Sequence, residues 1–531
     1  MKNFSHVPLY ASRRSPVFAS NVVAASQPLA VQAGLNMLQQ GGNAVDAALA
    51  AAMTLVVVEP TGNGLGSDAY CILWDGPELH GLNASGRSPA ALTPARFSGR
   101  DAMPLRGWDS VSVPGAVSAW VELSQRFGKL PFDRLLEPAI RYAERGYHVS
   151  PVIAETWRRG AEELKAQPGF AAAFMPDGRA PRAGELFFNR PLARSLRLIA
   201  ETKGESFYRG ELAERIAAFA IAGGAALTGD DLAAHRNDWC GTISQDFADA
   251  TLHEIPPNGQ GIAALMALGI LKHMGISQCK VDSIDAMHLQ IEAMKLAFAD
   301  LNAYVADQAY MKSVTVQHLL DPGYLAGRAK SIDPLRAKVF GAGAPKLGGT
   351  VCLAAADESG MMISYIQSNY AGFGSGVVVP ETGISLQNRA HGFSLEQGHP
   401  NQVGGGKRPF QTIIPGFITR SGRPAMAFGL MGGPIQAQGH VQMFLRTQLW
   451  NQDPQTAADA PRWRFMNGLN VAIEPAAGED LLAGLEHLGH RIIRETPQES
   501  FGFGGAQLVH AVDGGFVAGS DPRKDGHAAG F

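Results

Sequence analysis

The chain has 531 residues, of which 46% are hydrophobic and 18% charged, and its formal net charge at pH 7 is −3. This length predicts several domains or one large core, and the 62 glycines indicate many turns. Because the net charge is small and no run of Lys and Arg exceeds two residues, the sequence excludes the basic footprint of a protein that binds nucleic acid or an anionic membrane surface.

The four cysteines are widely spaced and form no CxxC pair: Cys71, Cys240, Cys279 and Cys352. We expect buried free thiols rather than a disulfide framework or a zinc motif, and no metal or organic cofactor. The N-terminal region lacks the apolar segment of a secretory signal, and the most apolar run, residues 47–58, is too short to cross a bilayer. We therefore expect a cytoplasmic protein without a membrane partner.

The first part of the chain is predicted to be rich in helices. A strand over residues 17–24 precedes an almost wholly apolar helix over residues 43–58, which is expected to be buried. Most of residues 150–250 also have a helical pattern, and the longest helix is predicted over residues 284–306. Residues 322–349 are polar, contain Gly and Pro and show little periodicity, which predicts a mobile linker.

After this linker the pattern changes to short strands. Residues 350–356 and 361–369 predict a hairpin, and further strands alternate with helices at residues 435–449 and 480–488. A helix-rich first part and a strand-rich second part, with helices available for both faces of antiparallel sheets, favour an α+β fold, specifically a four-layer αββα sandwich.

The stretch LGGTVCLAAAD, residues 347–357, contains the strongest candidate for chemistry. A Thr hydroxyl is a weak nucleophile unless a base accepts its proton, and the free amine of an N-terminal Thr can be that base, with a pKa of about 7.7–8.0. The flexible glycines before Thr350 allow its hydroxyl to approach the preceding peptide bond. On these residues alone, a loop entering a strand is the favoured interpretation, because short motifs often match by chance.

Many stretches in the same order resemble the γ-glutamyltransferase family of N-terminal-nucleophile (Ntn) hydrolases. They are GGNAVDAALAAAMTLVVVEPTGNGLG (41–66), SVPGAVSAW (112–120), LLEPAIRYAERGYHVSP (135–151), PPNGQG (256–261), GGTVCLAAAD (348–357), FGSG (373–376), GKRP (406–409), MGGPIQ (431–436) and DPRKDG (521–526). The resemblance implies self-cleavage between Gly349 and Thr350 into a large subunit, residues 1–349, and a small subunit, residues 350–531, which together form one αββα core.

The resemblance also implies roles for individual residues. Thr350 matches the nucleophile, and Gly432 and Gly433 match the pair whose N–H groups form the oxyanion hole. Ser368 stands where the family has a hydroxyl that supports the nucleophile, although a serine in a strand is often only a structural residue.

The family's glutamyl-binding pattern is not matched. In the loop NASGRSP, residues 83–89, the position of the family's arginine holds Ser85, and the only arginine is shifted to Arg87. The position of the family's acidic residue holds Gly392, beside His391. A buried α-ammonium group without a carboxylate partner would cost several kcal/mol, so a γ-glutamyl donor is not the favoured substrate.

We therefore expect a small amide substrate, anionic or neutral, in a pocket formed by Arg87, Tyr370, His391, Gln411 and Thr412. Arg87 is a candidate for binding a carboxylate, and a structural salt bridge is the alternative. Oxamate amidohydrolase is the family member most similar in this respect. Two alternatives stay open: γ-glutamyl transfer with Arg87 and Gln411 as recognition residues, and an uncleaved pseudoenzyme. The expected partners are the substrate and the two fragments of the precursor; a dimer of this unit is a further possibility.

Overall fold

The computed structural model describes residues 14–340, 349–497 and 501–531, and the side chains at positions 349, 350 and 501 lie outside this description. The region from 341 to 348, which holds much of the predicted linker, also lies outside it. The start of that linker was predicted wrongly. Pro322–Ala329 forms helix α14, which Asp321 caps and which buries Leu325 and Ala329.

Two seven-stranded sheets form the centre of the molecule, and their strand pairs are antiparallel. Sheet I has the order β1 (Val17–Ala19), β20 (Gly515–Ser520), β19 (Gly505–Val512), β15 (Arg423–Met431), β14 (Pro415–Arg420), β9 (Ala250–Glu254) and β8 (Ile243–Phe247). Sheet II has the order β21 (His527–Gly530), β2 (Val22–Ala25), β10 (Gly349–Ala356), β11 (Met362–Tyr370), β3 (Asp68–Trp74), β4 (Leu79–Ala84) and β7 (Asp238–Trp239). The predicted hairpin is thus confirmed as β10 and β11.

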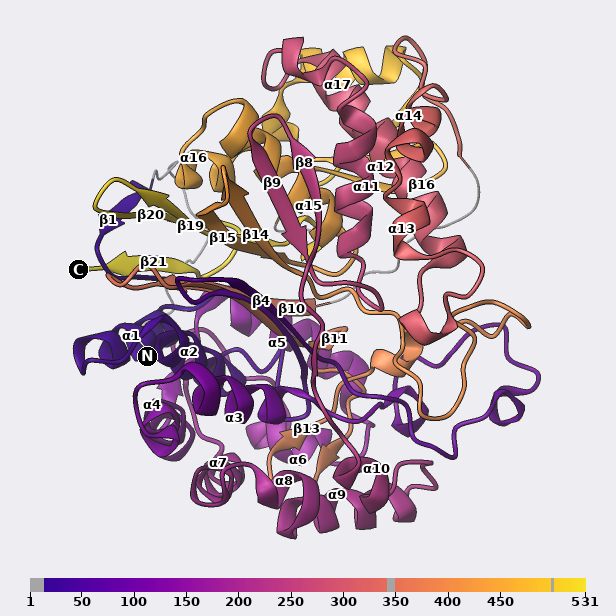
Figure 1. Ribbon diagram of the computed structural model, residues 1–531. Coiled ribbons are helices and arrows are strands. Elements are labelled where there is room, and N and C mark those ends of the chain that lie inside the picture. The colour runs from indigo at the N-terminus through magenta and orange to yellow at the C-terminus, as the bar shows by residue number, and fades with distance from the viewer. Residues whose placement is uncertain (1–13, 341–348, 498–500) are drawn as a thin grey trace.

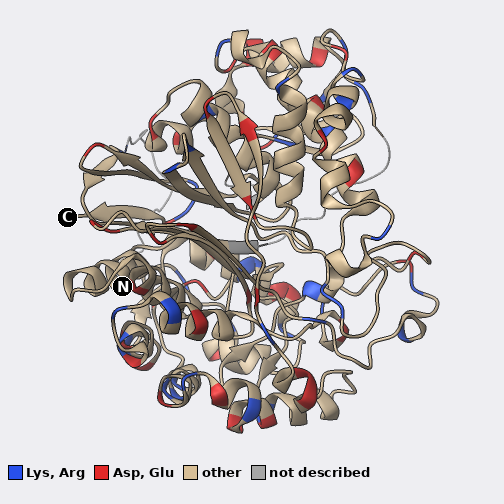
Figure 2. Ribbon diagram, in the orientation of Figure 1, with Lys and Arg blue, Asp and Glu red and all other residues tan. Residues whose placement is uncertain are grey.

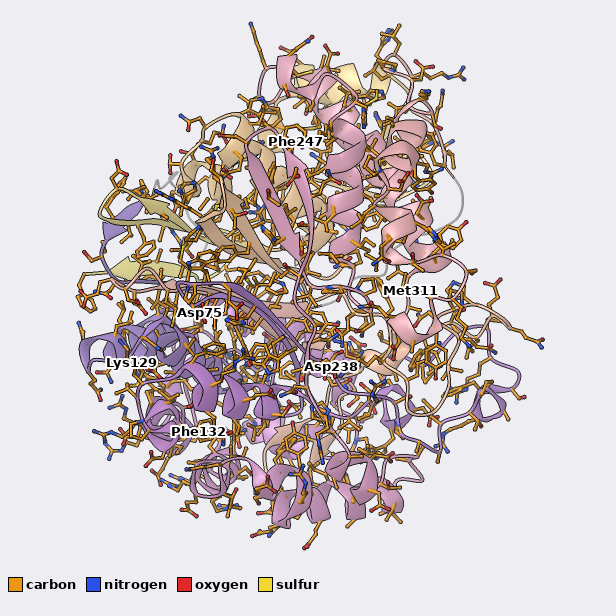
Figure 3. All side chains as sticks on the ribbon, viewed as in Figure 1. Asp75, Lys129, Phe132, Asp238, Phe247 and Met311 are labelled. Atoms are coloured by element: carbon orange, nitrogen blue, oxygen red, sulfur yellow. The ribbon has the colours of Figure 1, made fainter. Side chains whose placement is uncertain are left out.

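The two sheets pack face to face through one apolar cluster. In β10 the side chains alternate, because Cys352, Ala354 and Ala356 join the cluster between the sheets whereas Val351, Leu353 and Ala355 join the cluster on the helical side. A Cβ atom on Gly429 of β15 would lie 2.2 Å from the Sγ atom of Cys352. Glycine at this position therefore lets the sheets approach closely. Figure 3 shows side chains filling the space between the sheets.

Helices cover the outer face of each sheet (Figure 1). Beside sheet II lie α1 (Pro28–Gln39), α2 (Ala44–Val58), α3 (Ala116–Phe127) and α4 (Phe132–Arg145); beside sheet I lie α11 (Gly261–Leu271), α12 (Ile284–Tyr304) and α15 (Ile435–Phe444). The order helices, sheet, sheet, helices confirms the expected α+β arrangement. Lys, Arg, Asp and Glu are spread over the outer helices in Figure 2, and the sheets between them carry few.

The apolar helix α2 begins at a capping box, in which Asn43 and Asp46 each accept the other's backbone N–H. All 15 of its residues are buried. Its first N–H, on Ala44, donates to the carboxylate of Asp357 at 2.6 Å, in the turn after β10. The sequence prediction of a buried helix here is confirmed.

Smaller elements complete the chain. The helices are α5 (Pro151–Leu164), α6 (Phe170–Phe174), α7 (Arg190–Thr202), α8 (Glu205–Arg209), α9 (Glu211–Ala222), α10 (Gly229–Ala233), α13 (Val316–Leu319), α16 (Pro454–Asp459) and α17 (Glu479–His487). The strands are β5 (Tyr147–His148), β6 (Leu186–Phe187), β12 (Val378–Val379), β13 (Ile384–Ser385), β16 (Trp463–Asn467), β17 (Asn470–Ile473) and β18 (Arg491–Arg494). The prediction that residues 150–250 are mostly helical is confirmed as far as α10, but β7 and β8 occupy residues 238–239 and 243–247 at the end of this region.

Segments from before and after position 350 alternate within both sheets. β10 and β11 lie between β2 and β3 in sheet II, and β8, β9 and β1 flank the later strands of sheet I. The C-terminal residue lies beside the first strands, since the N–H groups of Ser20 and Asn21 donate to the carbonyl of Phe531 at 3.1 and 3.0 Å. Two of the four cysteines, Cys71 and Cys352, are buried as expected, whereas Cys240 and Cys279 are partly exposed.

Candidate active site

The backbone at position 350 lies at an irregularity in the pairing of β10 with β11. Gly349 pairs with Tyr370 and Val351 pairs with Gln367, so two residues of β11, Ser368 and Asn369, face the single residue 350. This is the geometry of a β-bulge, which redirects side chains and is frequent beside active sites. The side chain of the predicted nucleophile, Thr350, lies outside the described part of the chain.

Ser368 is buried in β11, and its hydroxyl accepts the N–H of Tyr370 at 2.7 Å. Tyr370 has a φ of 79°, in the left-handed region that a bulky residue rarely adopts. Such conformations cluster at functional sites and persist only where the surroundings enforce them. The structure therefore holds the end of β11 in an unusual conformation directly opposite the predicted cleavage point.

The predicted oxyanion pair lies in a tight turn between β15 and α15. Gly432 and Gly433 have φ values of 124° and 72°, and a Cβ atom on Gly432 would lie 2.6 Å from the Cγ2 atom of Ile435. Both positions thus require glycine. Gln260 fixes the turn, because its Nε2 atom donates to the carbonyl of Gly433 at 2.9 Å and to the carbonyl of Thr412 at 2.5 Å.

A cavity of about 200 Å³ adjoins this turn and is lined by three of the five predicted substrate-binding residues, Tyr370, His391 and Thr412. Pro434, which follows Gly433 directly, also lines it. The Nδ1 atom of His391 lies 2.8 Å from the carbonyl of Met103, which fits an N–H donor on that nitrogen. The remaining lining residues are Gln260, Phe298, Leu301, Asn302, Gly392, Phe393 and Phe410.

The other two predicted substrate-binding residues are not among those that line the cavity. Arg87, whose side chain is 47% exposed, pairs with Asp307 at 3.2 Å and donates to the carbonyl of Gly406 at 3.2 Å. This is the structural salt bridge that the sequence left open. Gln411 is fully buried and donates from Nε2 to the carboxylate of Asp68 at 2.6 Å.

Two charged residues near the site were missed by the sequence analysis. Asp68, at the start of β3, pairs with Ser368 across the sheet, so it lies in the same row as position 350. Burial raises the pKa of Asp68 to about 7, although the Arg389 charge and two hydrogen bonds, from the Gly86 N–H and from Gln411, lower it.

Arg389 is the second of these residues. It is 1% exposed, its Nη1 atom donates to the Thr412 hydroxyl at 2.9 Å, and its guanidinium lies 4.9 Å from the centre of the Tyr370 ring. Burial lowers its pKa to about 10. The sequence could have drawn attention to Arg389, because it stands two residues before His391 and close to Gly392, the position of the family's acidic residue.

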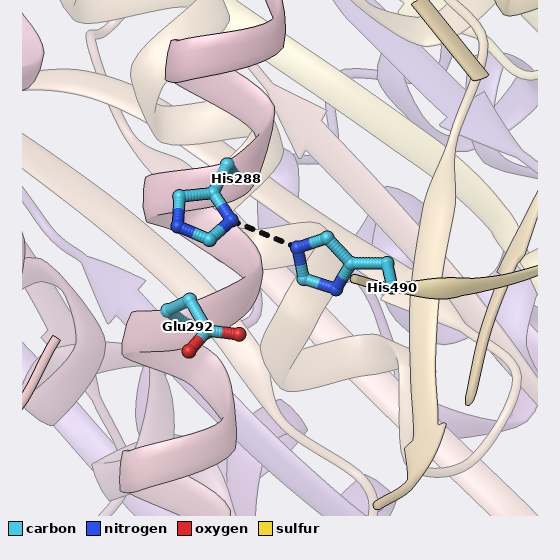
Figure 4. Close-up of side chains that lie close together, drawn as sticks. All are labelled: His288, Glu292 and His490. Carbon is cyan, nitrogen blue, oxygen red and sulfur yellow. Dashed lines mark hydrogen bonds between the residues drawn. The ribbon is translucent and has the colours of Figure 1, made fainter. Parts of the chain in front are cut away.

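A separate cluster, His288, Glu292 and His490, has the composition of a metal site and is buried (Figure 4). The His288 Nδ1 atom lies 2.8 Å from the His490 Nε2 atom, and the His288 Nε2 atom lies 2.8 Å from the carbonyl of Asp333. Glu292 accepts from the Lys295 ammonium at 2.6 Å. The ammonium supplies the positive charge beside the carboxylate, so this arrangement fits a hydrogen-bonded structural network better than a cation site.

Helical layers on two facing antiparallel sheets, with a bulge and a Gly-Gly turn beside one cavity, define the class of Ntn hydrolases. The family model described as gamma-glutamyltranspeptidase matches residues 30–531. The chain therefore belongs to the γ-glutamyltranspeptidase family and is an enzyme of that family.

Two curated relatives match almost end to end. The chain is 34% identical to the glutathione hydrolase-like YwrD proenzyme of Bacillus subtilis, over 98% of this chain and 100% of that one. It is 36% identical to the oxamate amidohydrolase proenzyme of Klebsiella pneumoniae, over 97% and 99% of the two chains. Among solved structures, cephalosporin acylase from Bacillus halodurans superposes with a TM-score of 0.95 at 45% identity, covering 100% and 99%. Within the described residues, the structure contains no helix with the length and apolar character needed to span a membrane.

Proposed function

We propose that the chain is a self-processing N-terminal threonine amidohydrolase that cleaves a small, oxamate-like amide. One observation carries the proposal: the bulge at position 350 and the Gly432–Gly433 turn lie close to one small cavity. Tyr370, which pairs with Gly349, and Pro434, which follows the turn, both line this cavity. Relatives named as proenzymes support self-processing.

Maturation begins when the Thr350 hydroxyl oxygen attacks the carbonyl carbon of Gly349. The new C–O bond replaces the C–N bond, the hydroxyl proton passes to the released amine, and an ester results. Water then hydrolyses the ester to give a Gly349 carboxylate and to restore the Thr350 hydroxyl, and Thr350 now carries the free amine released in the first step. The products are residues 1–349 and 350–531.

In turnover the same hydroxyl attacks the substrate amide while the Thr350 amine accepts its proton. The N–H groups of Gly432 and Gly433 stabilise the oxyanion, and the structure records no acceptor for either N–H among its described residues. The leaving amine takes the proton, and water hydrolyses the acyl-threonine ester. The threonine supplies both nucleophile and base, so this chemistry requires no metal or organic cofactor.

The size of the cavity favours a small substrate. At about 200 Å³ it is smaller than the roughly 300–1,000 Å³ typical of pockets for drug-sized ligands. Oxamate and other short amides fit this volume, and the oxamate amidohydrolase relative supports the same class. γ-Glutamyl hydrolysis or transfer is the second candidate, favoured by the relative named glutathione hydrolase-like. Release of p-nitroaniline from a γ-glutamyl anilide, accelerated by dipeptides, would establish that candidate instead.

The nucleophile is tested by substitution of Thr350. Thr350→Ala removes the hydroxyl, so the 56.3 kDa chain should stay intact on a denaturing gel, whereas Thr350→Ser should cleave slowly. In the wild type, Edman sequencing of the smaller fragment should begin Thr-Val-Cys-Leu, and a panel of short amides should release ammonia.

Thr93→Ala is the matched control, because Thr93 is exposed and its side chain makes no capping hydrogen bond. It should process like the wild type. Normal processing of Thr350→Ala would refute Thr350 as the nucleophile, and a wild-type chain that stays intact would identify an uncleaved pseudoenzyme.

A further inference from the structure

One edge of the Arg389 guanidinium has no hydrogen-bond partner. The Nη1 atom donates to Thr412, but the Nε and Nη2 atoms are buried and have no partner among the described residues. A buried donor without a partner costs free energy, and a buried cation costs more. This edge therefore has two donors available to a ligand that reaches it.

The unpartnered atoms have the geometry that a carboxylate requires. Nε and Nη2 lie on the same side of the planar guanidinium, so their N–H bonds point in parallel and match the two oxygens of a carboxylate. Within the described part of the chain, the structure records no ion pair between Arg389 and a carboxylate. Asp68 acts on Arg389 only at longer range, and its own oxygens accept from Gly86 and Gln411.

Arg389 also lies beside the residues that define the candidate site. It bonds Thr412 and stacks over Tyr370, and both line the cavity. Tyr370 pairs with Gly349 across the two strands, where paired Cα atoms are about 4.5–5.5 Å apart. Tyr370 thus lies against the guanidinium and also pairs with the strand that carries the cleavage point. The cavity that Tyr370 and Thr412 line has a volume of about 200 Å³, which suits a short acyl group.

We propose that Arg389 binds the substrate's carboxylate, so that the substrates are monoamides of short dicarboxylic acids. The inference rests on the proposed amide hydrolysis and names its substrate class. It assigns to Arg389 the role that sequence position suggested for Arg87, whose guanidinium is held by Asp307 and Gly406.

The test compares matched substrates that differ only in charge. Oxamate, succinamate and glutaramate each carry a carboxylate where oxamide, succinamide and glutaramide carry a second neutral amide. Ammonia release by the mature wild type should favour one or more of the anionic members by about 10²-fold in kcat/KM, since charge-assisted hydrogen bonds are the strong ones. Arg389→Gln should abolish that preference, mainly through KM.

Arg389→Lys keeps the positive charge but not the two parallel N–H donors, so it should retain part of the preference for anionic amides. Arg87→Gln is the competing variant and should keep the wild-type ratio. The proposal would be overturned if Arg87→Gln lost the preference for anionic amides and Arg389→Gln kept it. It would also be overturned if the wild type hydrolysed the neutral diamides with the same kcat/KM as the anionic amides. A denaturing gel and a melting curve establish that each variant matures and folds.

Calorimetric titration of the mature protein with oxalate, succinate and glutarate separates this proposal from the proposed reaction. Binding by the wild type that is lost in Arg389→Gln supports the carboxylate site even if no amide is cleaved. Amide hydrolysis by a wild type that binds none of these anions refutes the site but not the reaction. If the variants fail to fold, competition by the same dianions against amide hydrolysis by the wild type decides, and absence of competition overturns the proposal.

Discussion

At the scale of single residues, the proposed role of Arg389 makes the charge of the buried Asp68 carboxyl important, because Asp68 acts electrostatically on Arg389. The charged groups that act on Asp68 are Arg389 and Arg408, while burial also raises the pKa of the neighbouring Tyr70, so that phenol stays neutral. With a pKa of about 7, Asp68 is largely protonated at pH 6 and ionised at pH 8. Ionised Asp68 offsets the positive charge of Arg389 and repels a carboxylate substrate.

We therefore predict that the ratio of kcat/KM for oxamate to that for oxamide falls as pH rises from about 6 to 8. In the proposed mechanism the Thr350 amine acts on both substrates, so its own titration cancels from the ratio. Asp68→Asn should flatten the pH profile of the ratio. A wild-type ratio that does not change with pH, or an equally steep profile in Asp68→Asn, would contradict the prediction.

The same raised pKa has a consequence for stability. Between the unfolded value, near 3.8, and the folded value, about 7, the folded protein keeps a proton that the unfolded chain has released. The contribution of Asp68 to the free energy of unfolding therefore decreases as pH rises through this window.

Part of this site could be predicted from sequence. Thr350, Gly432 and Gly433 were predicted because each lies in a stretch that matches the family without interruption. For the Gly-Gly turn, the two glycines themselves are the feature that the sequence shows. Arg87 was proposed because it is the only arginine in the loop of residues 83–89, and no local pattern shows that Asp307, 220 positions away, pairs with it. The burial of Arg389 likewise depends on packing against Tyr370 and Thr412, which sequence periodicity does not report.

At the scale of elements, the contact between β10 and β15 depends on Gly429. Any side chain there would collide with the Cys352 sulfur, so we predict that Gly429→Ala destabilises the protein by about 1–3 kcal/mol and lowers its melting temperature. Cys352→Ala removes the sulfur and leaves the Cys352 Cβ at 3.7 Å, an ordinary contact, so it should recover much of the loss in the double variant. Additive losses in the double variant, measured by scanning calorimetry, would exclude this contact as the cause.

The elements also show where periodicity is informative. The hairpin of β10 and β11 was predicted because an apolar strand is followed by a turn at residues 357–360 and then by a second strand. α14 was missed because it has eight residues and buries only Leu325 and Ala329, too few to establish a helical period. β8 was missed because its short alternating pattern follows a region of genuine helices, and its pairing with β9 is not visible in the sequence.

At the scale of the whole molecule, the proposed cleavage divides a chain whose parts share both sheets. Residues 1–349 and 350–531 should therefore elute together under native conditions and separate only after unfolding, because neither fragment has a complete sheet alone. Size-exclusion chromatography before and after addition of guanidinium chloride measures this. A smaller fragment that elutes alone from a native, active sample would contradict the prediction.

The contact between Phe531 and Asn21 brings the C-terminus next to the first described strands, and Arg14 donates to the carbonyl of Gly526 at 2.7 Å. A short linker from residue 531 to residue 14 would thus permit a circularly permuted gene that starts at codon 350. Once the initiator methionine is removed, translation itself would deliver the reactive amine. Catalysis could then be measured without prior self-cleavage of the precursor. This would include variants that cannot cleave themselves.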